Sequence, residues 1–236
     1  MLTSKLASAP CTLLVALAIV SPVAADQKVE LFNGKDFTGW TKRGGKAEYS
    51  VENGEIVGRS VPNTPNTFMT TDKEYGDFVL ELEFKIEDTD FNSGIQIRSH
   101  VRPERGQERV YGYQVEIDPK PDRAWSAGLY YEGGKKADDA SDKDDWVRKA
   151  GWLDDLADNE AARKAFKLGE WNQVRIEARG RNIKTWINGV PAADFTDSDE
   201  KAFAPAGFIA LQVHGVGSAR DPKEVRWRNI QLTVLE

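Results

Sequence analysis

Short segments of alternating apolar and polar residues, separated by turn pairs, constrain this 236-residue chain more than any other feature. Asn-Gly pairs recur between the segments, for example at residues 33–34 and 188–189, and such pairs favour tight turns between antiparallel strands. Helical periodicity is nearly absent outside residues 145–167, where Asp158 is placed to cap a helix-forming run over residues 161–166. The pattern therefore predicts an all-β sandwich or barrel.

The predicted strands follow one another without a break in composition. No repeat or Pro-rich linker divides them, so we expect a single domain over residues 26–236. Residues 132–168 are predicted to be a charged insertion that carries the short helix. The strands are predicted at residues 47–51, 55–59, 77–86, 94–100, 112–117, 128–131, 172–179, 182–187, 207–214 and 224–234.

The first 25 residues are typical of a secretory signal peptide. Lys5 precedes an apolar run over residues 11–20, and small residues lead to Ala25, where we expect cleavage. A bilayer-spanning helix needs about 20 apolar residues, so no transmembrane segment is expected, and a retained anchor helix is the alternative. The only cysteine, Cys11, lies in this segment. The protein is thus predicted to be periplasmic or secreted, with neither a disulfide nor a thiol nucleophile.

The charge balance excludes one class of partner. The formal net charge is −6 at pH 7 and the sequence pI is about 5.2. Binding to nucleic acid or to an anionic lipid surface needs a clustered cationic face. We therefore expect neither partner.

Counting along the predicted strands in twos separates a core face from a polar face. On residues 94–100, 112–118 and 207–214, the apolar positions share one face, and the other face carries Gln96, Arg98, Gln114, Glu116, Gln212 and His214. A merely solvated face favours Lys, Glu and Thr, whereas this set suits sugar hydroxyls. We expect a carbohydrate-binding groove here, with three nearby indoles that either stack on sugar rings or belong to the core: Trp125, Trp152 and Trp186.

The chain has two histidines, and they differ in their setting. His100 ends a predicted strand, where a local structural role is expected. His214 continues the polar face and precedes Gly215, where the chain is free to turn sharply. A reactive and a structural role for His214 are both open at this point.

Residues 116–118 resemble the start of the Glu-x-Asp-x-Glu motif of laminarinase-type glucanases, whose two glutamates act as nucleophile and acid. In this chain Lys120 occupies the position of the second glutamate. Conventional retaining hydrolysis on this strand is therefore not expected. Nucleophile-elbow, P-loop and dinucleotide-binding motifs are also absent from the sequence.

Motifs spread over nearly the whole mature chain resemble the bacterial 3-keto-disaccharide hydrolase domain family. The resemblance implies a concanavalin-A-like jelly-roll sandwich of two antiparallel sheets, acting on sugars already oxidised to a ketone at C3. Many relatives carry Asp where this chain has Val213, which alternation directs into the core. The matching segments are residues 31–40, 92–95 with Arg98, 112–118, 128–130, 170–172, 186–189, 207–215 and 227–230.

A C3 ketone acidifies the C2 proton, so that a base can remove it and the enolate can expel the glycosidic oxygen from C1. Addition of water to the unsaturated product then gives net hydrolysis. Glu116 or His214 is expected to be the base, and the other the proton donor. Arg98, with Gln114 or Gln212, is expected to stabilise the enolate. A divalent cation held by His214 and Glu116 is an alternative to Arg98 in that role.

This chemistry implies a partner enzyme, because a sugar 3-oxidase must generate the substrate. Two other functions remain open from the sequence. One is a non-catalytic carbohydrate-binding module that uses the same groove, and the less favoured one is a conventional glucanase acting on unoxidised glucans.

Overall fold

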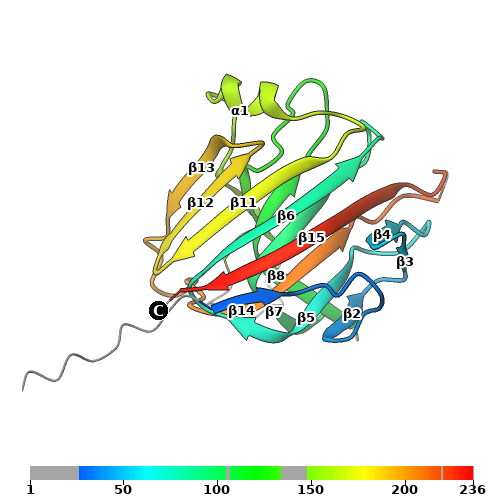
Figure 1. Cartoon of the computed structure of the whole chain (residues 1–236), viewed down its shortest axis with the longest axis horizontal. Helices are drawn as coiled ribbons and strands as arrows, with labels where there is room; N and C mark the ends of the chain where they lie inside the picture. The colour runs from blue at the N-terminus through cyan, green and yellow to red at the C-terminus, as the bar shows by residue number, and fades with distance from the viewer. Residues whose placement is uncertain (1–26, 105–106, 134–147, 219, 236) are drawn as a thin grey trace, which may run out of the picture.

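Two antiparallel sheets stack face to face in the computed structural model, which describes residues 27–104, 107–133, 148–218 and 220–235 (Figure 1). The eight-stranded sheet runs β13 (Val190–Thr196), β12 (Asn182–Ile187), β11 (Asn172–Arg179), β6 (Phe78–Ile86), β15 (Glu224–Val234), β4 (Glu55–Arg59) and β3 (Glu48–Glu52), with β1 (Gln27–Glu30) paired to β15. The seven-stranded sheet runs β10 (Gly151–Asp154), β9 (Leu129–Glu132), β8 (Gln107–Ile117), β7 (Ser93–Glu104), β14 (Gly207–Val213), β5 (Thr67–Tyr75) and β2 (Trp40–Gly44).

The core lies between the two sheets and is built from the apolar sets that alternation separates. Ile95, Val115 and Leu211 of the seven-stranded sheet are fully buried there, as are Leu80 and Ile176 of the other sheet. The predicted jelly-roll sandwich of two antiparallel sheets with a short helical insertion is therefore confirmed.

The helix α1 (Glu160–Ala165) begins after Asn159, not after Asp158 as predicted. The Asn159 Oδ1 atom accepts from the Ala162 amide at 3.1 Å, and its Nδ2 donates to the carbonyl oxygens of Pro191 and Ala192. An aspartate could cap the helix but could not make the second set of bonds, because a carboxylate has no donor. The asparagine thus fastens the helix to β13.

The sequence did not predict five of the observed strands, which are β1, β2, β5, β10 and β13. Alternation is weak in four of them: β1 is mostly exposed, β2 and β10 are only partly buried, and β5 begins with five consecutive buried residues. The predicted signal peptide falls outside the described residues. Within the described part of the chain, no helix is long and apolar enough to cross a membrane.

The distal half of the β7–β8 hairpin folds over the outer face of the seven-stranded sheet. β8 and β2 are four positions apart in that sheet, which is about 19 Å at the usual strand spacing. Yet Arg43 Nη1 on β2 lies 2.9 Å from Glu108 Oε1 on β8. Phe68, Val110 and Phe208 form a second buried cluster beneath the hairpin. One end of the outer face is therefore closed by the protein itself.

A β-bulge in β7 accompanies this bend. The register between β7 and β8 shifts between Ile97 and His100, and Arg98 has a φ of 45°, a left-handed conformation that is uncommon outside glycine. On the facing strand, Gly112 has a φ of 147°, and a Cβ there would stand 2.9 Å from Ser99 Cα. Only glycine fits at position 112 without displacing the bulge.

Candidate functional site

Four of the predicted polar side chains do share the outer face of the seven-stranded sheet, and they form a continuous hydrogen-bonded row. Gln96 Nε2 donates to Gln114 Oε1 at 3.0 Å, and Gln114 Nε2 donates to Glu116 Oε1. Gln212 lies beside them, with its Oε1 3.4 Å from Gln114 Nε2. None of the four is more than 4% exposed. Where the sequence predicts a carbohydrate-binding groove, these four side chains form a buried polar layer.

Glu116 is the ionisable member of this layer, and its surroundings disfavour a negative charge. Burial raises the pKa of Glu116 to about 8, and the nearby carboxylates of Glu132 and Asp118 act in the same direction. Hydrogen bonds from the side chains of Gln114 and Asn92 offset only part of this effect. At neutral pH the Glu116 carboxyl is mainly protonated, so it is able to act as an acid.

His214 borders a surface cavity of about 510 Å³ at the end of β14. Asn92, Lys120 and Arg220 line the same cavity. The His214 Nδ1 atom lies 2.7 Å from the carbonyl oxygen of Gly215. A carbonyl only accepts, so Nδ1 must carry the hydrogen, and in the neutral ring the lone pair is then on Nε2. His214 is therefore set up to accept a proton at Nε2.

Asn92 connects the acid and the imidazole. The pairing of Val213 with Ser93 places His214 opposite Asn92, one step beyond the end of the ladder. Asn92 lines the cavity together with His214, and its side chain also acts on Glu116, where it lowers the pKa of the carboxyl. Glu116 and His214 thus lie on either side of one asparagine, at one end of the sheet.

The prediction that Arg98 joins these residues is wrong. Its guanidinium donates to the carbonyl oxygens of Gly76 and Gly180 at 2.8 and 2.6 Å, and to Asp77 Oδ1 at 2.7 Å. Counting in twos fails here because the bulge inserts an extra residue, and Ser99 takes the place on the polar face, where its Oγ donates to Gln96. Arg98 instead joins the β5–β6 turn to the β11–β12 turn.

Comparison with known protein families finds one match. Residues 27–233 match the 3-keto-alpha-glucoside-1,2-lyase-like domain. The chain belongs to this family. Among curated proteins, none matches the sequence.

Solved structures similar to this lyase-like domain share its fold. A proposed glycosyl hydrolase from Parabacteroides distasonis is 22% identical, with a TM-score of 0.58 over 89% of this chain and 94% of that one. A Bacillus licheniformis beta-glucanase is 13% identical, with a TM-score of 0.53 over 91% of this chain and 100% of that one. The carbohydrate binding module CBM66 from Bacillus subtilis is 16% identical, with a TM-score of 0.52 over 82% of this chain and 94% of that one.

Two of the three predicted tryptophans flank the polar layer of the lyase-like domain. The rings of Trp125 and Trp152 meet edge to face at 4.8 Å, and Tyr130 meets Trp152 at 5.4 Å. Gly128 lies opposite Glu116 in the sheet, and a Cβ on it would stand 3.1 Å from the Trp152 ring. The aromatic cluster therefore lies directly beside the strand that carries Glu116.

Trp186, in contrast, does not belong to the site. It lies on β12 of the other sheet, where the guanidinium of Arg175 stacks over its ring at 4.4 Å. The prediction that Trp186 lies near the groove is wrong, because β12 pairs with β11 in the eight-stranded sheet and the groove was predicted on the other sheet.

Three residues of this site were not singled out from the sequence: Asn92, Tyr130 and Glu132. Alternation along the strands is sufficient to place the first two on the polar face. Asn92 has the same parity as Gly94 and Gln96, and Tyr130 has the parity opposite to the buried Leu129. Glu132 had no such signal, since it was assigned to the insertion. Its nearness to Glu116 depends on the pairing of β9 with β8.

No cluster of three or more His, Cys, Asp or Glu side chains that could hold a metal ion occurs among the residues that the structure describes. The divalent cation at His214 and Glu116 stays a prediction.

The new place of Arg98 leads to a stability prediction. We expect Arg98→Met to lower the free energy of unfolding by about 3 kcal/mol. The substitution removes a fully buried guanidinium together with its three charge-assisted hydrogen bonds. Urea denaturation measures this. Arg43→Met, which removes a half-exposed ion pair with Glu108, is the control and should cost about 1 kcal/mol or less. Equal losses in the two variants would contradict the structural role of Arg98.

Proposed function

We propose that this domain cleaves 3-keto-glycosides by elimination across C1 and C2, followed by addition of water. The observation that carries the proposal is the pairing of one protonated carboxyl, Glu116, with one imidazole lone pair, His214 Nε2, on either side of Asn92. This chemistry needs one acid and one base rather than a carboxylic acid paired with a carboxylate nucleophile. Membership of the lyase-like domain family supports the same assignment.

In the proposed reaction, His214 Nε2 removes the C2 proton, and the electrons of that C–H bond form an enolate with the C3 carbonyl. The enolate then re-forms the ketone and expels the glycosidic oxygen, so that the C1–O bond breaks and a C1=C2 bond forms. Glu116 donates its proton to the departing oxygen. Water then adds at C1 of the resulting enone and gives one proton to the Glu116 carboxylate, while the proton held by His214 returns to C2. The C2–H bond and both groups are thereby restored, which completes net hydrolysis.

A residue other than Arg98 must stabilise the enolate, because the Arg98 guanidinium bonds to Gly76, Asp77 and Gly180. Lys120 lines the same cavity as His214 and carries a positive charge. It also occupies the position at which the glucanase motif has its second glutamate. We assign the enolate-stabilising charge to Lys120, which fits the loss of the second carboxyl group and the gain of an electrostatic role at one position.

A second candidate function is non-catalytic carbohydrate binding. The specific observation in its favour is that Glu116 is only 4% exposed, while the aromatic cluster of Trp125, Trp152 and Tyr130 offers ring faces and edges nearby. One similar structure is a carbohydrate binding module. In this role the polar layer would hold the sheet together and the aromatic rings would hold the sugar.

The proposed substrate also places the protein in a cellular setting. A 3-keto sugar must be supplied by an oxidation at C3, so we propose an upstream sugar 3-oxidase as the functional partner. The predicted signal peptide supports a periplasmic or secreted site of action.

The test is to incubate the protein with a 3-keto-glucoside that carries a chromogenic leaving group and, in parallel, with the unoxidised glucoside and a glucan. We expect release from the keto compound only, with a transient enone absorbance. Binding without release would instead favour the carbohydrate-binding module, and release from the unoxidised compounds would favour a glucanase. Repeating the assay with a chelator tests the predicted cation: an unchanged rate would exclude it.

A further inference from the structure

The ring of His214 is held through the residue that follows it. Gly215 accepts the His214 Nδ1 hydrogen at its carbonyl oxygen, and its own amide donates to Asn66 Oδ1 at 2.9 Å. The carbonyl group of Gly215 therefore bonds to the imidazole, and its amide group bonds to the Asn66 side chain. The orientation of the ring depends on where Gly215 is held.

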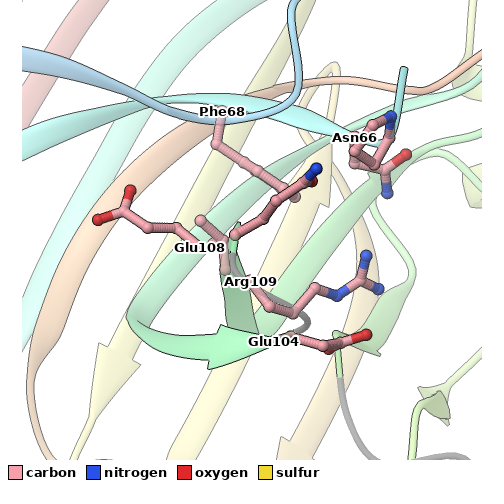
Figure 2. Close-up of a pocket in the computed structure, with 8 residues that line it drawn as sticks. Asn66, Phe68, Glu104, Glu108 and Arg109 are labelled. Carbon is pink, nitrogen blue, oxygen red and sulfur yellow. The ribbon is translucent and has the colours of Figure 1, made fainter. Parts of the chain in front are cut away.

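Asn66 is itself fixed from its other side. Its Nδ2 donates to Glu132 Oε1 at 3.1 Å, and Arg109 Nη2 donates to the same oxygen at 3.0 Å. Asn66 and Arg109 both line the pocket shown in Figure 2, beneath the β7–β8 hairpin. An amide hydrogen only donates and a carboxylate only accepts, so the side-chain amide of Asn66 has a single orientation that satisfies both neighbours. Asparagine fits this position because it accepts on one side and donates on the other.

Backbone packing keeps Gly215 against this asparagine. A Cβ on Gly215 would stand 2.5 Å from the carbonyl oxygen of Thr64 and 3.3 Å from the backbone nitrogen of Asn66. Val216, the next residue, pairs with Pro62 and accepts a hydrogen bond from the Asn63 amide at its carbonyl oxygen. The turn after β14 is thus seated on residues 62–66, and its carbonyl is presented to His214 from a fixed position.

We propose that Asn66, anchored by Glu132, is a positioning residue that selects the Nδ1–H tautomer of His214. A neutral imidazole in water favours the hydrogen on Nε2, so a base that works through Nε2 needs a partner that holds the hydrogen on Nδ1. Gly215 is that partner, and Asn66 holds Gly215. The tautomer selection stands on these hydrogen bonds alone, whereas its effect on turnover rests on the proposed function.

The tautomer is directly measurable, because the protein has only two histidines. In a long-range ¹H–¹⁵N correlation spectrum recorded where the rings are neutral, we expect His214 of the unmodified protein to show a protonated Nδ1 and an unprotonated Nε2. Asn66→Ala should shift His214 towards the Nε2–H form. Asn66→Asp keeps an acceptor for Gly215 but cannot donate to Glu132, and its carboxylate would face that of Glu132, so it should also shift His214 towards the Nε2–H form. Asn182→Ala, which removes a side chain bonded to Asp194 and Thr196 on β13, is the matched control and should change nothing.

Two outcomes would overturn the proposal: an Nε2–H tautomer in the unmodified protein, or an unchanged tautomer in folded Asn66→Ala. If that variant does not fold, Asn66→Ser, whose shorter side chain cannot span from Gly215 to Glu132, serves with the same expectation. In the 3-keto-glucoside assay, Asn66→Ala should lower kcat about tenfold with little change in KM. If no variant turns over the substrate, the proposed function fails while the tautomer result still decides the role of Asn66.

Discussion

Glu116→Gln should lower turnover of a 3-keto-glucoside by at least about 100-fold, which is the usual scale for losing an acid or base. The amide keeps the shape of the side chain and its hydrogen bond with Gln114, but it cannot donate a proton to the leaving oxygen. Steady-state kinetics on the chromogenic substrate measure the effect. Glu108→Gln, on the exposed part of the same strand, is the matched control and should leave kcat within about twofold.

The pH dependence assigns the direction of proton transfer at Glu116. Because the pKa of Glu116 is raised to about 8, a proton donor at this position is competent below that pH, and the rate should fall as the pH rises through about 8. If Glu116 were instead the base, the rate would rise over the same interval. A flat profile, or near-normal turnover by a folded Glu116→Gln variant, would remove Glu116 from the reaction.

The same substitution should stabilise the fold at alkaline pH. The raised pKa keeps Glu116 protonated in the folded state at pH values where the carboxyl of the unfolded chain is already ionised. This difference costs the folded state free energy, and the cost grows as the pH rises from about 4.5, where the unfolded carboxyl ionises, to about 8. Glu116→Gln avoids this cost. We expect the variant to gain about 2 kcal/mol or more relative to the unmodified protein at pH 8, and little at pH 4. If Glu116→Gln loses activity and gains stability, the loss of activity is not caused by unfolding.

His214→Ala should also lower turnover by at least about 100-fold, since it removes the group that accepts the C2 proton. His214 borders the 510 Å³ cavity, so truncation leaves a space that is open to solvent. Added imidazole should therefore enter and restore part of the rate. The other histidine provides the control: His100, whose ring packs on Tyr111, should be replaceable by Gln with a change in kcat of about twofold or less.

Hydrogen exchange at C2 distinguishes a missing base from a general defect. The unmodified protein should exchange the C2 hydrogen of a bound 3-keto sugar with deuterium from solvent, whereas His214→Ala should not. Exchange at the normal rate in the variant would show that another group removes the proton.

Alternation in the sequence is sufficient to predict the sandwich and much of the site, because the buried apolar sets of β7, β8 and β14 leave their polar partners on one face. Gln96, Gln114, Glu116 and Gln212 lie together for this reason. His214 and Asn92 follow by extending the same register one step past the strand ends. Parity along a regular strand predicted five of these residues, and Asn92, which was not singled out from the sequence, has the same parity.

The rest depends on features that parity does not encode. Arg98 left the predicted face because one inserted residue reverses every later side chain in the strand, and the sequence around it does not reveal the left-handed backbone at that position. Glu132 and Asn66 reach the site through strand pairing and a turn contact between distant segments. The burial of the polar layer was not predictable for a related reason, because folding of the hairpin over the sheet is a long-range event.

The folded-over β7–β8 hairpin also limits the size of molecule that the site can accept. Enzymes that cut inside a long glycan need a channel open at both ends, so that the chain extends past the cleavage point in two directions. Here Arg43 and Glu108 join across the sheet face and bar one direction, with Phe68 and Val110 packed behind them. For the proposed reaction at Glu116 and His214, we therefore expect the reacting sugar to be the terminal unit of its chain, so that digestion releases single sugars and leaves the remaining oligomer one unit shorter.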